Sequence, residues 1–329
     1  MRDGKELILN RLNEISDRLG ENVTHVEDLR RLSGGASQET WCFYAVGPND
    51  REKLILRRSP FAKEASQAIG LAKEAEILDA ISDSNIPAPR VKHLFAEGDE
   101  IGSAYVMSAI EGETLPQKIM KSPEFADGIG NIAAQCGTAL AKLHAFPSEK
   151  IPGLPVSNVA EQLDQYETIL REYGIERPVF ELALQWLKAN KPEVDANCLV
   201  HGDFRMGNLM IDSQGLAGIL DWEICHIGNP REDMGWICTN SWRFGRRDKR
   251  VGGVGDLSEL LDAYEAAGGE HITEREIDYW ECLGSFKWGI MCQTMYQTFK
   301  TDDPTIERGS IGRRSSETEI DLMNILETV

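Results

Sequence analysis

Residues 198–223, CLVHGDFRMGNLMIDSQGLAGILDWE, contain the polar side chains best suited to chemistry. Two apolar runs in this segment, NLMID and AGILD, are separated by SQGL, and this pattern predicts a β-hairpin. With a loop of four residues, Asp212 faces Ala217, and counting back along both strands sets Asn208 opposite Asp221. The sequence therefore predicts that an amide and a carboxylate meet at one end of a hairpin.

Asp203 lies in the loop HGDFRMGN, shortly before Asn208. Carboxylate and amide oxygens suit Mg²⁺, which binds few protein ligands and keeps waters for substrate phosphates. In phosphoryl transfer, a catalytic-loop Asp receives or orients the acceptor hydroxyl, while an Asn and a second Asp hold the metal. The arrangement predicts Asp203 as a catalytic residue and Asn208 and Asp221 as metal ligands. The alternative is a plain hairpin whose Asp and Asn side chains stabilise turns.

A second pair of charged residues occurs on two predicted apolar elements. The helical pattern of LAKEAEILDAI places Glu74 within an apolar stripe, and the alternation of KLILR predicts a strand that carries Arg57. An unpaired buried charge costs several kcal/mol, so we expect Glu74 to have a cationic partner. Arg57 is the candidate, and Arg58 is the competitor on the other face of the strand. A solvated Arg57 is the alternative.

The hairpin segment carries a family resemblance. HGDFRMGN followed by LDWE is similar to the HGDxxxxN and D-W signature of the aminoglycoside phosphotransferase and choline kinase superfamily, which is related to the protein kinases. The segment GNPREDMGW resembles the family's G-D-P-x-x-D-L-A, with Asn229 in place of the usual Asp and Asp233 retained. The similarity extends from about residue 29 to the C-terminus. It implies ATP and Mg²⁺ as cofactors and a small-molecule hydroxyl group as phosphate acceptor.

The resemblance also implies a nucleotide site. SGGASQ resembles the loop that covers the nucleotide, Arg57 with Glu74 resembles the ion pair that aligns the phosphates, and YVMSAIEGETL resembles the hinge that contacts adenine. A glycine turn without a ligand and an ordinary core strand are the alternatives for the first and last segments. The residues expected to bind nucleotide are Ser33, Gly34, Gly35, Ala36, Ser37, Arg57, Glu74, Met107, Ser108 and Ile110.

The elements around these residues predict the fold. Residues 1–110 combine short apolar runs with one long helix, which indicates a sheet with one helix packed on it, and residues from about 115 onward are mainly helical in pattern. With the resemblance, this predicts an α+β, protein-kinase-like fold. We expect residues 1–110 to form the nucleotide-binding lobe and residues 111–329 to form a helical lobe with the catalytic loop, metal site and acceptor site.

Composition limits the partners and the compartment. The formal charge of −19 and the isoelectric point near 4.8 disfavour nucleic acid or an anionic membrane as a partner. Seven cysteines without a CxxC pair predict reduced thiols. The sequence has no signal-peptide pattern and no apolar run long enough to span a membrane, so we expect a cytoplasmic protein. The oligomeric state stays open.

The phosphate acceptor is not identified by these motifs. WRFGRRD, YEAAGG and IGRRSSETEIDL resemble the kinase-like domain of certain acyl-CoA dehydrogenases, which implies a hydroxyacyl-CoA as acceptor. A basic cluster is consistent with an anionic acceptor, although a solvated loop is the alternative. An antibiotic kinase, for aminoglycosides for example, and a nucleotide-binding regulatory protein without turnover are the competing functions. The cluster comprises Arg243, Arg246, Arg247, Lys249 and Arg250.

Two further groups are predicted to be structural. His201 directly precedes the catalytic loop, and the family resemblance implies that it orients the loop rather than transferring protons. An aromatic stripe in the C-terminal region is predicted to be helical core rather than an acceptor pocket, because large aromatic side chains dominate core burial. The stripe comprises Trp280, Phe286, Trp288 and Tyr296.

Overall fold

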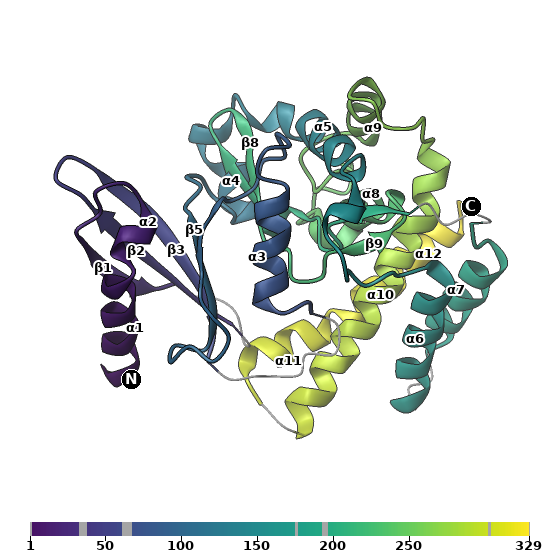
Figure 1. Ribbon diagram of the computed structural model, residues 1–329. Coiled ribbons are helices and arrows are strands. Elements are labelled where there is room, and N and C mark those ends of the chain that lie inside the picture. Colours follow the sequence, from purple (N-terminus) through teal and green to yellow (C-terminus); the bar gives the residue numbers. More distant parts are fainter. Residues whose placement is uncertain are drawn as a thin grey trace.

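The computed structural model describes residues 2–32, 38–60, 68–174, 177–192, 197–301 and 304–328. A small antiparallel sheet near the N-terminus lies beside a larger, mainly helical part (Figure 1). This is the predicted α+β, kinase-like arrangement. None of the helices in the described ranges combines the length and the apolar character that crossing a membrane requires.

The sheet has five strands in the order β1-β2-β3-β5-β4, and all neighbours are antiparallel. Alternation along β3 buries Leu54 and Leu56 on one face, against α1 and α2, and turns Arg57 toward the opposite face. The strands are β1 (His25–Arg31), β2 (Glu39–Val46), β3 (Arg51–Ser59), β4 (Val91–Leu94) and β5 (Ser103–Ser108).

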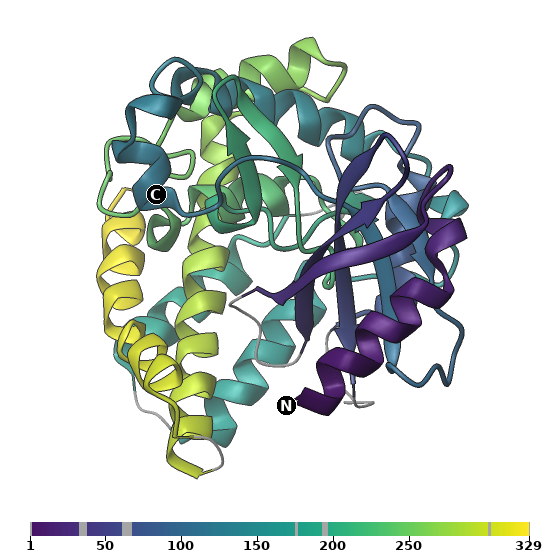
Figure 2. The ribbon, with the colours of Figure 1, turned by 90° about the vertical axis from the view of Figure 1, so that its left-hand side faces the viewer.

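Helices cover both faces of this sheet, so the prediction of one helix undercounted them. Helix α1 lies against the first face (Figure 2). Its Ile8 and Leu12 are fully buried there. On the second face, α3 buries Leu71, Glu74 and Leu78, as its apolar spacing predicts. The helices of this part are α1 (Arg2–Glu14), α2 (Ser16–Leu19) and α3 (Leu71–Ala80).

The helical part is organised around α10, which runs for 28 residues and packs against α7, α8, α11 and α12. Side-chain caps begin several helices; at α6, for example, Asn158 accepts a hydrogen bond from the Glu161 N–H. The α-helices are α4 (Pro116–Lys121), α5 (Ile132–His144), α6 (Val159–Glu172), α7 (Pro178–Ala189), α8 (Arg231–Cys238), α9 (Leu257–Ala266), α10 (Glu274–Thr301), α11 (Ile306–Arg313) and α12 (Ser315–Leu326). The short 3-10 helices are η1 (Pro123–Phe125), η2 (Ile129–Asn131), η3 (Ser148–Lys150), η4 (Met206–Asn208) and η5 (Asn240–Trp242).

Two small antiparallel sheets interrupt the helices. β6 (Cys198–Val200) pairs with β9 (His226–Gly228), and β7 (Leu209–Asp212) pairs with β8 (Gly215–Ile219). The second pair is the predicted hairpin, and it lies near the sheet of the N-terminal part (Figure 1).

The predicted register of this hairpin is wrong. The loop contains two residues, so Asp212 pairs with Gly215 rather than Ala217. Gly215 adopts φ +119°, a conformation open to glycine, and this allows the chain to reverse earlier than predicted. The ladder ends at Leu209, and Asn208 lies in η4 with its carbonyl accepting the Leu220 N–H at 2.8 Å. Asn208 therefore does not face Asp221 across the ladder.

Candidate active site

Arg57 and Glu74 form the ion pair that the sequence predicts. Arg57 Nη1 lies 2.9 Å from Glu74 Oε1, and the two side chains are 12% and 1% exposed. Burial raises the pKa of Glu74 to about 7, although the Arg57 guanidinium opposes this shift. Arg58 lies on the other face of β3 and contacts Glu39, with 3.3 Å between Nε and Oε2. Arg58 is therefore not the partner of Glu74.

Arg57 also connects the sheet to the end of the hairpin. Its Nη2 donates to Asp221 Oδ1 at 3.1 Å and to Gln38 Oε1 at 2.6 Å. Gln38 Nε2 in turn donates to Glu223 Oε2 at 3.0 Å. Burial, together with the charge of Asp221, raises the pKa of Glu223. One guanidinium therefore holds groups from three separate chain segments.

Asp203 and Asn208 are in direct contact. Asn208 Nδ2 donates to Asp203 Oδ2 at 2.6 Å and to the Asp203 carbonyl at 3.0 Å. Because the amide nitrogen makes both bonds, its oxygen stays available for another partner. Two further donors reach Asp203: Trp236 Nε1 lies 2.7 Å from Oδ1, and Arg205 Nε lies 3.0 Å from the same oxygen. The Asp203 carboxylate is thus fixed by three side chains.

A cavity of about 440 Å³ lies between the sheet and the hairpin. Of the described residues that line it, Arg57 is the one cation, whereas Glu74, Asp221 and Glu223 are acidic. The described lining consists of Leu32, Gln38, Thr40, Arg57, Glu74, Leu78, Pro89, Tyr105, Met107, Thr114, Gly207, Asn208, Leu220, Asp221, Trp222 and Glu223. The structure thus places both predicted metal ligands, the ion pair and Met107 around one space.

The donor set in this cavity fits a magnesium ion bound together with phosphate. Asn208 offers its amide oxygen, and Asp221 offers a carboxylate that is 32% exposed. Asp221 has φ +67°, a strained value for a residue other than glycine. Within the described ranges, no group of three or more His, Cys, Asp or Glu side chains could hold a metal ion. Two oxygen ligands with room for water and phosphate match the preference of Mg²⁺.

The other predicted nucleotide contacts have different surroundings. Ser33, Gly34, Gly35, Ala36 and Ser37 lie outside the described residues. The N–H groups of Ser108 and Ala109 donate to the carbonyls of Arg90 and Lys53 at 2.9 and 3.3 Å. The side chain of Ile110 lies close against Gly218. The N–H groups of Ser108 and Ala109 are therefore already bonded within the protein. Met107, by contrast, lines the cavity.

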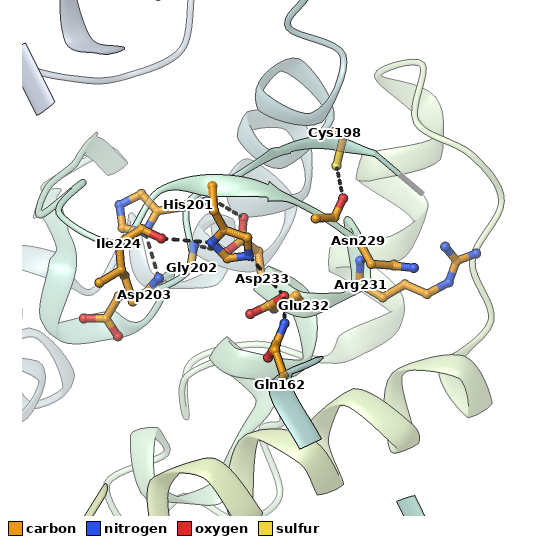
Figure 3. A network of polar contacts seen from close by, with 12 residues as sticks. Gln162, Cys198, His201, Gly202, Asp203, Ile224, Asn229, Arg231, Glu232 and Asp233 are labelled. Carbon is orange, nitrogen blue, oxygen red and sulfur yellow. Dashed lines mark hydrogen bonds and ion pairs between the residues drawn. The ribbon is translucent and has the colours of Figure 1, made fainter. Parts of the chain in front are cut away.

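Asp233 of α8 holds the loop that contains Asp203 through backbone hydrogen bonds. Asp233 accepts the backbone N–H of His201 and that of Gly202, each at 2.9 Å (Figure 3). His201 Nδ1 accepts the Asp203 N–H at 3.2 Å, so Nε2 carries the proton and donates to the Leu220 carbonyl at 3.0 Å. Burial lowers the pKa of His201, which favours this neutral form. Its contacts fit the expected orienting role.

A buried polar network extends from this loop to α6 and α10. Glu232 accepts from Gln162 at 3.0 Å, contacts His226 at 3.3 Å and pairs with Lys287 at 3.0 Å (Figure 3). Burial opposes ionisation of Glu232, but Lys287 and His226 outweigh it and keep the pKa well below the usual range. The network fixes α8, and so Asp233 as well.

The basic cluster at residues 243–250 is partly neutralised. Arg243 is buried and bonded to the Cys238 carbonyl and to Glu281, and Arg250 contacts Glu281 at 2.8 Å and Asp278 at 2.7 Å. Lys249 pairs with Asp256 at 2.8 Å. Glu281 and Asp278 come from α10, far along the sequence, whereas Asp256 is only seven residues from Lys249. Arg246 and Arg247 stay exposed, so only part of the predicted positive cluster is paired with acids.

The predicted aromatic stripe divides into two groups. Trp280 and Phe286 belong to a buried core with α6 and α7 residues, as predicted. Tyr296 is 42% exposed, and Trp288 is only partly buried, with its ring 4.8 Å from that of Trp242. The outer half of the stripe is therefore not core.

Sequence reasoning missed several residues of the site. Glu223 lies two residues after Asp221, and in an extended segment this spacing places both side chains on the same face. Trp236 stands one helical turn after Asp233, which could have indicated a common face. Nothing in the spacing indicates that Trp236 and Arg205 both contact Asp203, because these contacts depend on how α8 packs against the loop.

Comparison with known sequences places this site in a family context. The sequence pattern of the phosphotransferase enzyme family matches residues 28–279. Acyl-CoA dehydrogenase family member 10 of Mus musculus is 26% identical over 231 residues, which are 67% of this chain but 21% of the mouse protein. The 4-hydroxytryptamine kinase of Psilocybe cyanescens is 24% identical over 274 residues, covering 72% of this chain and 73% of that enzyme.

Solved structures share the fold at low sequence identity. A putative aminoglycoside phosphotransferase from Ralstonia eutropha JMP134 has a TM-score of 0.75 at 19% identity, with 98% of each chain covered. A mutant aminoglycoside phosphotransferase in ternary complex with AMP-PNP and hygromycin B has a TM-score of 0.62 at 15% identity, covering 96% of this chain and 99% of that chain. These similarities support the kinase-like fold.

Proposed function

The chain belongs to the phosphotransferase enzyme family, and from this premise we propose that it is an ATP- and Mg²⁺-dependent kinase that phosphorylates a hydroxyl group of a small molecule. The contact between Asp203 and Asn208, beside a cavity that Asn208, Asp221 and Arg57 line, carries this proposal. It joins a carboxylate suited to an acceptor hydroxyl with a site suited to nucleotide phosphates.

The nucleotide belongs in the cavity between residues 1–110 and 111–329, which we treat as the two lobes. Met107 would contact the base, and Arg57, fixed by Glu74, would contact the phosphates. That Ser33 to Ser37 cover the phosphates is proposed from the family resemblance alone. A structurally related phosphotransferase that binds AMP-PNP supports this placement.

Asn208 and Asp221 would hold Mg²⁺. When bound, the ion neutralises phosphate charge, which this cavity requires because its described lining has three carboxylates and one guanidinium. Within the protein, Asn208 also holds Asp203 through its amide nitrogen. The same side chain would therefore set the spacing between the metal site and the catalytic carboxylate.

Asp203 would act on the acceptor hydroxyl. As the hydroxyl oxygen forms its bond to the γ-phosphorus, its proton passes to Asp203, and the bond between that phosphorus and the bridging oxygen of ADP breaks. Donors on both carboxylate oxygens hold Asp203 in one orientation, and this favours in-line attack.

The acceptor we propose is a hydroxyacyl-CoA. The support comes from the relatives named acyl-CoA dehydrogenases, of which this chain matches only a fraction of the length. An aminoglycoside is the second candidate, supported by the structural neighbours. A regulatory protein without turnover is disfavoured, because Asp203, Asn208 and Asp221 are all present.

The test is an acceptor screen with purified protein, Mg-ATP and panels of hydroxyacyl-CoAs, aminoglycosides, amino alcohols and sugars. ADP release and phosphorus NMR of the product are the readouts. Asp203→Asn should lower turnover by at least about a hundredfold, whereas Asp262→Asn, on the exposed side of α9, should match the wild type. If no acceptor is phosphorylated, or Asp203→Asn remains fully active, the proposed function is wrong.

A further inference from the structure

Arg205 stands at the catalytic carboxylate with unused hydrogen-bonding capacity. Its Nε lies 3.0 and 3.2 Å from the two oxygens of Asp203, and its side chain is 27% exposed. In the described part of the chain, no acceptor contacts its Nη1 or Nη2. The guanidinium lies over the ring of Trp242, with 4.9 Å from its carbon to the ring centre. It is therefore held in place while its two terminal amino groups stay available.

Three tryptophans extend from Asp203 in a continuous row. The ring centres of Trp236 and Trp242 are 5.4 Å apart, and those of Trp242 and Trp288 are 4.8 Å apart. Trp236 donates its indole N–H to Asp203 Oδ1 at 2.7 Å. The indole nitrogens of Trp242 and Trp288 are buried and have no acceptor among the described residues. Because both nitrogens are buried, these two rings pack beside Arg205 and Trp236 and do not themselves reach a bound acceptor.

Three cations lie over the rings of this row. Lys287 Nζ lies 5.7 Å from the ring centre of Trp236, and the Arg314 guanidinium lies 5.7 Å from that of Trp288. Lys287 is already paired with Glu232 at 3.0 Å and Arg314 with Glu317 at 3.2 Å. Arg205 is the one of the three whose terminal amino groups have no acceptor among the described residues, so an anionic acceptor could bind there.

We infer that Arg205, held against the ring of Trp242, recognises an oxyanion, a carboxylate or phosphate, on the compound whose hydroxyl group meets Asp203. This inference rests on the proposed function, which it narrows to anionic hydroxy compounds. The terminal amino groups of Arg205 bind the oxyanion, and the guanidinium packs against the ring of Trp242. Arg205 thereby selects the substrate next to the reacting group, and the basic cluster at residues 243–250 has no part in it.

The experiment compares acceptors that differ in one anionic group. One pair is 4-hydroxybutyrate and its methyl ester, and the other is 4-hydroxybutyryl-phosphopantetheine and 4-hydroxybutyryl-pantetheine, which lacks the phosphate. In the wild type, kcat/KM should favour the anionic member of at least one pair by about tenfold or more. The favoured pair identifies carboxylate or phosphate as the recognised group. Equal rates within both pairs would overturn the inference.

Variants separate recognition from a general effect on Asp203. Arg205→Gln should raise KM for the anionic acceptor by about tenfold and reduce the anionic preference to about threefold or less, and Arg205→Lys should lie between. If Arg205→Gln only disturbed Asp203, kcat/KM would fall equally for both members of a pair and the anionic preference would stay. That result would contradict the inference. Arg246→Gln is the matched control, since Arg246 is 48% exposed and its contact with Asp248 is 3.9 Å.

A binding measurement keeps the two proposals distinguishable. The same four compounds are titrated by calorimetry into protein saturated with Mg-AMP-PNP. If none is phosphorylated, but the anionic members bind and Arg205→Gln abolishes that binding, the proposed function fails while the inference stands. If neutral and anionic members bind equally and are phosphorylated equally, the inference fails while the proposed function stands.

Discussion

Arg57 contacts residues from three segments of the chain, and this concentrates the electrostatics of the cavity in one side chain. It pairs with Glu74 at 2.9 Å and donates to Asp221 and Gln38. Removing one partner of a buried ion pair costs more than the pair contributes, because the remaining charge stays buried. Conservative substitutions that change only protonation or hydrogen bonding are therefore the informative ones.

Glu74→Gln should reveal a pH-dependent contribution to stability. The pKa of Glu74 is raised from its ordinary 4.5 to about 7, so the folded protein keeps a proton that the unfolded chain has released in between. The stability that the raised pKa of Glu74 contributes is fully present below pH 4.5 and is lost as pH rises to about 7. Urea unfolding across this range should show wild-type stability falling relative to the variant by about 1 to 3 kcal/mol.

Glu76→Gln is the matched control for this measurement. Glu76 lies on the same helix, and its side chain is 42% exposed. The stability of Glu76→Gln should follow the same pH dependence as that of the wild type. A constant difference between wild type and Glu74→Gln at every pH would contradict the assigned pKa shift.

Asn208→Ala should damage metal use and Asp203 together. It removes the amide oxygen proposed for Mg²⁺ and the donor that contacts Asp203 Oδ2 at 2.6 Å. We expect kcat to fall by at least about tenfold and half-maximal activity to need several-fold more Mg²⁺. Magnesium titration of ADP release is the measurement, with Asn190→Ala at the end of α7 as control. An unchanged magnesium requirement would remove Asn208 from the metal site.

The sequence predicted residue chemistry better than residue contacts. The apolar stripe around Glu74 and the alternation of β3 were enough to predict the ion pair, since both depend on local periodicity. The pairing of Asn208 with Asp221 rested on a hairpin register that the structure contradicts. Both residues nevertheless line one cavity, because the loop and η4 bring them there. Contacts of this kind follow from tertiary packing, which spacing alone does not encode.

At the scale of elements, α8 positions the loop that contains Asp203. Asp233 is fully buried in the first turn of this helix and accepts two backbone N–H groups of the loop, and the network around Glu232 holds the same turn. The resemblance to the family pointed to Asp233, but its partners could not be deduced from a motif. The hairpin itself was predicted correctly, but its loop is shorter than predicted because Gly215 has a positive φ that allows the earlier reversal.

Asp233→Ala should loosen the loop without removing any group proposed to touch substrate. Two buried N–H groups lose their acceptor, so the free energy of unfolding should fall by about 2 to 5 kcal/mol. Urea unfolding measures this loss, and hydrogen exchange should be faster at residues 201–203. Asp262→Ala, on the exposed side of α9, should change neither measurement. Unaltered exchange at the loop would show that α8 does not hold it.

At the scale of the whole molecule, few described polar contacts join the sheet to the hairpin region. Two of them join side chains, Arg57 with Asp221 and Gln38 with Glu223. Two more join backbone groups next to the sheet: the Ile69 N–H donates to the Glu223 carbonyl and the Ile219 N–H to the Pro87 carbonyl, each at 2.8 Å. The first two border the cavity proposed for the nucleotide. A ligand there would contact both parts at once, so binding should stabilise them together.

Two neighbouring arginines allow this coupling to be tested. Arg57 and Arg58 lie on the same strand, but Arg57 reaches Asp221 in the helical part, whereas Arg58 contacts Glu39 within the sheet. Arg57→Met should therefore speed hydrogen exchange both in β3 and at residues 219–223, and Arg58→Met should speed it in the sheet only. Measuring at pH 6, where Glu74 is largely protonated, limits the cost of leaving that carboxyl without its partner.

Arg57→Met should also weaken Mg-ATP binding by about tenfold or more, while Arg58→Met leaves it near the wild-type value. Identical exchange patterns in the two variants would show that the Arg57–Asp221 contact does not couple the two parts.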